Sequence, residues 1–168
     1  MRKAPYRISE VIKALGKLEV EFSKLEFWLT MYLETLINDN SEIAEIVTAE
    51  LSIRAKIDLL MSLYRYHEKD ENKVLELQRF LARVSKTNKQ RNYLIHSTWE
   101  LSKVSVIRIK KTAKFETGLR KERDRINVLR DIENTIARIT KDSEDVRDRL
   151  LMSVIENQKM LERIFTEL

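Results

Sequence analysis

Residues 71–98 read ENKVLELQRFLARVSKTNKQRNYLIHST, a segment that contains neither glycine nor proline. Apolar residues recur in it at three- and four-residue spacing, which is the pattern of a helix packed on one face. These residues are Val74, Leu77, Leu81, Val84 and Ile95. The segment therefore predicts a long helix from about residue 71 to residue 98.

Polar residues near the end of this predicted helix occupy unusual positions. At roughly 100° per residue, Arg91 projects from the apolar sector. Asn88, Asn92 and His96 form a polar stripe along the edge of that sector. A guanidinium that faces a core needs hydrogen-bonding partners or water, because an unpaired buried charge is costly. One interpretation is structural: Arg91 pairs with a carboxylate, and His96 is an ordinary surface histidine.

The composition limits the fold class. A chain of 168 residues is most simply one domain with a substantial core. Only two glycines and one proline interrupt it, which favours long helices over a sheet-rich fold. We expect an all-α protein, an up-down helical bundle of about four long helices with a short β-hairpin or extended excursion before the last helix. The absence of cysteine excludes disulfides, thiolate catalysis and cysteine-based zinc sites.

Two helices are predicted before residue 71. The first runs from near Ile8 to about Asn38, with apolar residues at the spacing of a bundle seam. Those apolar residues are Val11, Leu15, Leu18, Phe22, Leu25, Leu29, Leu33 and Leu36. Ser41 can cap a second helix over residues 41–67 after the break at residues 38–40. His67 falls in the polar turn that follows, where we expect an exposed turn residue and not a ligand.

The pattern changes after residue 98. Residues 101–112 alternate in part between apolar and polar side chains, and Gly118 supplies a turn, which predicts a short β-hairpin or extended excursion. Asn127 offers an N-cap for a final helix over residues 127–168. If continuous, that helix extends about 60 Å and is available for a partner helix. The alternative is a kink near residues 140–145 that folds the helix back within the monomer.

Positive charge is concentrated in one part of the chain. The formal net charge is +5. Between residues 103 and 125 the basic residues are Lys103, Arg108, Lys110, Lys111, Lys114, Arg120, Lys121, Arg123 and Arg125. The acidic residues of the same stretch are Glu116, Glu122 and Asp124. The stretch could follow a phosphate backbone, or it could be the solvated face of a hairpin, and the sequence does not choose between them.

Arg91 and Asn92, followed by three residues and His96, resemble the R-x4-6-H signature of HEPN domains. These are small all-helical proteins common among prokaryotic toxins and RNA-processing factors. Asn92 matches the polar residue that the family prefers after the arginine. The resemblance covers most of the chain and is best over residues 1–98. It implies a single HEPN-like domain over residues 1–168, with a basic hairpin or loop at 99–126 and a long C-terminal helix at 127–168.

The resemblance also implies an activity. HEPN ribonucleases cleave RNA without metal or cofactor, through a composite Arg/His site at a homodimer cleft, and leave 2',3'-cyclic phosphate ends. In that scheme His96 moves a proton, Arg91 stabilises charge at phosphorus and Asn92 supports them. Asn88, Lys110 and Lys111 are the candidate RNA-binding residues. The implied partners are RNA, a second copy of the chain and a cognate antitoxin or nucleotidyltransferase.

One position departs from the family pattern. In HEPN toxins paired with minimal nucleotidyltransferases, a tyrosine commonly follows the histidine by two residues, and here that position is Thr98. We expect a toxin or phage-defence ribonuclease; the alternatives are an inactive HEPN-like module that binds RNA or a nucleotide, and a structural helical assembly protein. No apolar run approaches a membrane span, and no signal-peptide core follows the basic start, so a cytoplasmic protein without membrane partners is expected.

Overall fold

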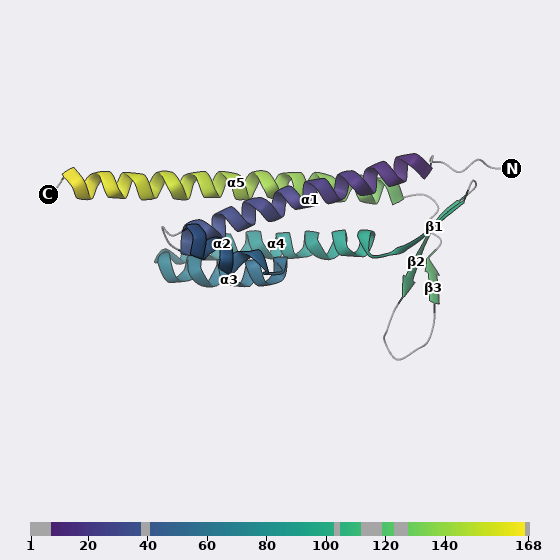
Figure 1. The fold of residues 1–168 in the computed structure, drawn as a ribbon, viewed down its shortest axis with the longest axis horizontal. Helices are drawn as coiled ribbons and strands as arrows, with labels where there is room; N and C mark the ends of the chain where they lie inside the picture. The colour runs from purple at the N-terminus through teal and green to yellow at the C-terminus, as the bar shows by residue number, and fades with distance from the viewer. Residues whose placement is uncertain (1–7, 38–40, 103–104, 112–118, 123–127, 167–168) are drawn as a thin grey trace. The chain divides into compact units, whose positions relative to one another are not determined.

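The computed structural model describes residues 8–37, 41–102, 105–111, 119–122 and 128–166. Within these ranges the chain is mostly helical, as predicted, with five helices and three strands (Figure 1). No helix in the described ranges has the length and apolar character needed to cross a membrane. The predicted break at residues 38–40, the turn at Gly118 and the N-cap at Asn127 lie outside the described residues.

Helix α1 (Ile8–Ile37) begins at the predicted residue and ends one residue before Asn38. Most residues of its apolar repeat are buried; Leu15 and Leu36 are half-buried. The buried residues of the repeat are Val11, Leu18, Phe22, Leu25, Leu29 and Leu33. The four- and three-residue spacing returns these side chains to one face of the helix, which is why burial follows the repeat.

The single helix predicted over residues 41–67 is wrong, because the structure has two helices there. They are α2 (Ser41–Ala49) and α3 (Ile53–His67). Ser52 adopts an extended conformation with φ −62° and ψ 155°, and its hydroxyl accepts a hydrogen bond from the backbone N–H of Ala55 at 3.3 Å. A serine in this geometry is an N-cap, which begins a new helix and ends the register of the previous one.

Helix α4 (Glu71–Ile95) ends three residues before the predicted limit. Its buried apolar residues are Val74, Leu77, Phe80, Leu81, Val84 and Leu94. Past its end, the hydroxyl of Ser97 donates to the carbonyl of Tyr93, and the indole N–H of Trp99 donates to the carbonyl of Leu94 at 3.0 Å. These side chains satisfy carbonyls that a helix terminus leaves without partners, so the chain turns off the helix after Ile95.

Three short strands follow α4 and form one antiparallel sheet in the order β1-β2-β3 (Figure 1). They are β1 (Thr98–Ser102), β2 (Ser105–Lys111) and β3 (Leu119–Glu122). The register places Trp99 opposite Arg108 and Lys110 opposite Arg120. The first strand thus begins two residues after His96.

Helix α5 (Val128–Thr166) has 39 residues and continues through residues 140–145. At 1.5 Å per residue it extends about 58 Å. Its buried apolar residues are Val128, Ile132, Ile136, Ile139, Val146 and Leu150. The side chains beyond Val154 lie outside those that the structure describes.

The chain divides into two compact units. One comprises Met1–Phe22 and Thr87–Arg138, and the other comprises Ser23–Lys86 and Ile139–Leu168. The Arg91–His96 segment and the three strands belong to the first unit, and α2 and α3 belong to the second.

Candidate functional site

The residues of the HEPN-like motif lie at the C-terminal end of α4. Arg91 and Asn92 are in the last two turns of the helix, and His96 is the first residue after it. The backbone N–H of His96 donates to the carbonyl of Asn92 at 3.0 Å, so the helical path continues to this residue. His96 is exposed, whereas Arg91 and Asn92 are half-buried. His96 follows the half-buried Asn92 by about one helical turn, and its exposed imidazole can contact a ligand from solvent.

Arg91 pairs with a carboxylate of α1. Its Nε donates to Glu19 Oε2 at 3.0 Å, and its Nη2 donates to Glu19 Oε1. The Arg91 side chain is 16% exposed and the Glu19 side chain 44% exposed. Cζ of Arg91 lies 4.6 Å from the ring centroid of Phe22, a buried residue of α1. The guanidinium is therefore held at one edge by a carboxylate and covered on one face by an aromatic ring.

Asn92 is joined to the same guanidinium. Nη1 of Arg91 donates to Oδ1 of Asn92 at 2.8 Å. A guanidinium has donors and no acceptor, so the amide must present its oxygen to Arg91. That orientation leaves the two N–H donors of the Asn92 amide for another partner.

The three predicted RNA-binding residues lie in two elements, Asn88 in α4 and both lysines in β2. Asn88 lies one turn before Asn92 in α4, and its buried Oδ1 has no hydrogen-bond donor among the described residues. A buried acceptor of this kind calls for a donor. Lys110 and Lys111 lie in β2, opposite Arg120 and Leu119 of β3. They belong to the same compact unit as the motif, and their side chains lie outside those that the structure describes.

Sequence reasoning missed Glu19 and the role of Phe22. The sequence indicated Phe22 as a core residue of the first helix, but not as a cover for a guanidinium. Glu19 is one of 27 acidic residues and precedes Arg91 by 72 positions, so nothing local marks it. Its spacing of three residues from Phe22 places both on one face of α1.

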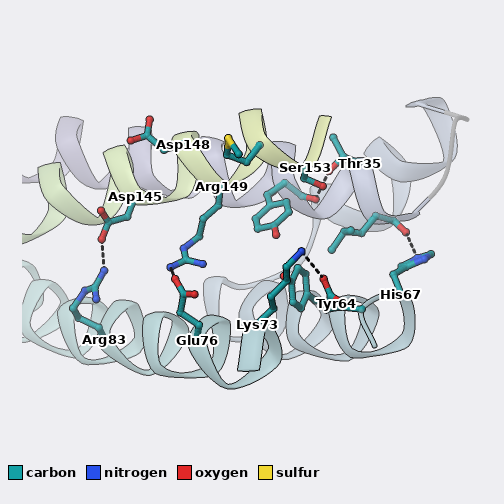
Figure 2. A pocket seen from close by; sticks show the side chains of 14 residues that line it. Thr35, Tyr64, His67, Lys73, Glu76, Arg83, Asp145, Asp148, Arg149 and Ser153 are labelled. Atoms are coloured by element: carbon teal, nitrogen blue, oxygen red, sulfur yellow. Dashed lines mark hydrogen bonds and ion pairs between the residues drawn. The ribbon is translucent and has the colours of Figure 1, made fainter. Parts of the chain in front are cut away.

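A second candidate site is a cavity of about 620 Å³ in the other compact unit (Figure 2). Its walls come from α1, α3, α4, α5 and the residue after α3. The lining residues are Tyr32, Thr35, Leu36, Tyr64, His67, Glu68, Lys73, Glu76, Arg83, Asp145, Asp148, Arg149, Met152 and Ser153. The cavity is thus rich in charged side chains of both signs.

The cations of this cavity are all engaged by carboxylates. Arg149 donates to Glu76 at 2.7 Å, and Arg83 pairs with Asp145, as the dashed lines of Figure 2 show. The ammonium of Lys73 lies 3.5 Å from Glu68. Each of these cations is neutralised by a carboxylate of the protein itself. The cavity therefore contains an ion-pair network and not an open anion site.

His67 lies at the rim of this cavity. It is the last residue of α3 and is exposed, and its Nε2 lies 3.1 Å from the backbone carbonyl oxygen of Leu36. The prediction of an exposed residue is confirmed; its place is the end of a helix, where a turn was expected.

Among the described residues, no three histidine or acidic side chains gather into a group that could hold a metal ion. Comparisons of the chain with family models, curated proteins and solved structures find no match. The functional assignment therefore depends on the residues of the site.

Proposed function

We propose that this protein is a metal-independent endoribonuclease of HEPN type that acts as a homodimer in a toxin or phage-defence system. The up-down bundle of about four long helices with a β excursion is part of the same proposal. The observation that carries it is the grouping of Arg91, Asn92 and the exposed His96 at one end of α4. In phosphodiester cleavage by internal transfer, an imidazole can move a proton, and a guanidinium and an amide can donate hydrogen bonds to the phosphoryl oxygens.

The reaction needs two proton transfers. One imidazole takes the proton of the ribose 2'-hydroxyl as its oxygen attacks phosphorus, and a second gives a proton to the departing 5'-oxygen. The products are a 2',3'-cyclic phosphate and a 5'-hydroxyl. The chain has only two histidines, and His67 belongs to the other compact unit. The resemblance to HEPN ribonucleases implies that the second proton carrier is the His96 of a second copy, which is why the proposal includes a homodimer.

Arg91 stabilises the negative charge that develops on the phosphoryl oxygens, because a guanidinium is positively charged and offers its N–H donors in a fixed plane. The RNA backbone is held by basic residues of the sheet, where Lys110 faces Arg120 in the strand register. Both groups belong to the compact unit that contains the motif, which supports a shared role.

The test is cleavage of a labelled RNA by purified protein in the presence of EDTA. His96→Ala and Arg91→Ala are each expected to abolish cleavage while the dimer remains intact. His67→Ala removes the only other histidine, and Arg79→Ala removes an exposed arginine from the same helix, so both matched controls should cut at the wild-type rate. If His67→Ala lost cleavage to the same extent as His96→Ala, the assignment of His96 would be rejected.

The Arg91–Glu19 pair favours a second candidate, an inactive HEPN-like module that binds RNA or a nucleotide. A guanidinium already neutralised by a carboxylate stabilises a phosphorane less well than a free one. This candidate is preferred if the wild-type protein binds RNA in a filter or anisotropy assay and never cuts it. If neither binding nor cleavage occurs and Arg91→Ala unfolds the protein, the chain is a structural helical protein.

A further inference from the structure

We propose that Glu19 is a positioning residue of this site, which fixes the edge that Arg91 presents to the substrate phosphate. The inference depends on the proposed ribonuclease function and adds a residue to it from a different helix. Glu19 does not contact the reacting atoms. It acts through Arg91 and, through Arg91, on the orientation of the Asn92 amide.

The donors of the guanidinium can be assigned one by one. An arginine has five N–H donors. Glu19 accepts from Nε and Nη2, and Asn92 accepts from Nη1. Within the part of the chain that the structure describes, the other two N–H donors, one on each terminal nitrogen, have no hydrogen-bond acceptor. Glu19 therefore occupies the edge that contains Nε and leaves a donor on both terminal nitrogens for an anion.

The position of Arg91 is fixed by two contacts from α1. Glu19 holds the guanidinium in its plane, and the Phe22 ring, with its centroid 4.6 Å from Cζ, covers one face. Rotation of the side chain would break the ion pair and the aromatic contact together. With 16% of the Arg91 side chain exposed, little space remains for another arrangement.

The same contacts orient the substrate-facing amide. Arg91 accepts no hydrogen bond, so Asn92 turns its oxygen to Nη1 and its N–H donors away. Loss of Glu19 would free the guanidinium to turn, and the amide would lose its fixed partner. Neither the charge nor the amide donors would then be held in a fixed position toward the phosphate.

The opposite role for Glu19 makes a different prediction. If the carboxylate competes with RNA for Arg91, its removal should strengthen RNA binding and raise the cleavage rate. If it positions Arg91, its removal should leave binding nearly unchanged and lower the rate of the chemical step. The partition between KM and kcat separates the two roles.

The experiment compares Glu19→Gln, Glu19→Asp and wild type in RNA cleavage, with rates normalised to the folded fraction measured by circular dichroism. Glu19→Gln should lower kcat by about 10- to 100-fold, since small misplacements of catalytic groups cost rates of this order. KM should change less than about threefold, because binding common to substrate and transition state is retained. Glu19→Asp keeps the charge and should recover part of the loss. Glu42→Gln removes the same charge from an exposed position of α2 and should cut like wild type.

A higher kcat or a lower KM in Glu19→Gln would overturn the positioning role, and so would an unchanged kcat. Failure of the wild-type protein to cut RNA would instead reject the proposed function. In that case the Arg91 Nε–H resonance in an ¹⁵N spectrum still tests the positioning. It should exchange slowly with solvent in wild type and rapidly in Glu19→Gln, and equally rapid exchange in both would reject the role of Glu19.

Discussion

The coupling energy between Glu19 and Arg91 can be measured in a double-mutant cycle of Glu19→Gln and Arg91→Met. Two unit charges about 4 Å apart attract by about 4 kcal/mol at an effective dielectric constant of about 20. Desolvation of the Arg91 side chain, of which 16% is exposed, and the ordering of both side chains offset much of this attraction. Glu19 stays 44% exposed, which places the pair between a surface pair and a buried one. We expect a net coupling of about 1–2 kcal/mol.

The assay is equilibrium urea denaturation followed by circular dichroism for wild type, both single variants and the double variant. Methionine keeps most of the arginine stem against Phe22, so the cycle isolates the charged contact better than a change to alanine would. The double variant should be more stable than the sum of the two single effects predicts. A coupling below about 0.3 kcal/mol would refute the view that Glu19 holds Arg91 in the folded protein, because such a value is typical of a fully solvated pair.

Three further stability predictions concern the second compact unit. Arg83→Ala should lower the free energy of unfolding by about 2–3 kcal/mol in urea denaturation, because it removes the 2.8 Å bond from the guanidinium to the carboxylate of Asp142, which is 2% exposed; a loss below about 0.5 kcal/mol would contradict it. Ser52→Ala should cost about 1 kcal/mol by removing the N-cap of α3, and a change to Asn should restore most of this in the same measurement. Lys56→Met should lower the melting temperature less than Lys56→Ala. Both changes remove the 3.3 Å contact to Glu26, but only methionine keeps an aliphatic side chain in place of the buried stem of Lys56. Equal losses would show that the stem contributes nothing to stability.

Periodicity predicted the extents of α1 and α4 closely because each buries one continuous face. It failed over residues 41–67, where a run of apolar residues suggested one helix. Ile43 and Val47 are 53% and 43% exposed, while Ala44 and Thr48 are buried. When a short helix carries apolar residues on all sides, their hydrophobicity does not identify the face that packs against a neighbouring helix. Tertiary packing determines that face.

The local position of the site was predictable, and its partners were not. The helical projection placed Arg91 toward the packed side of α4, and its side chain is indeed largely buried against Phe22. The structural interpretation, that Arg91 pairs with a carboxylate, is what the structure shows. The identity of that carboxylate depends on how α1 packs against α4, which the sequence of either helix alone does not encode.

The pairing of Arg91 with Glu19 has a consequence for how RNA would approach the protein. The two charges cancel at long range, so the motif itself contributes little to the attraction of a polyanion. The dependence of the RNA association rate on ionic strength should then come from basic residues elsewhere, among them Lys110 and Arg120 of the sheet. A variant that carries both Glu19→Gln and Arg91→Gln has the net charge of wild type. Its rate of association with RNA should show the same dependence on ionic strength as that of wild type, even when the variant no longer cleaves RNA.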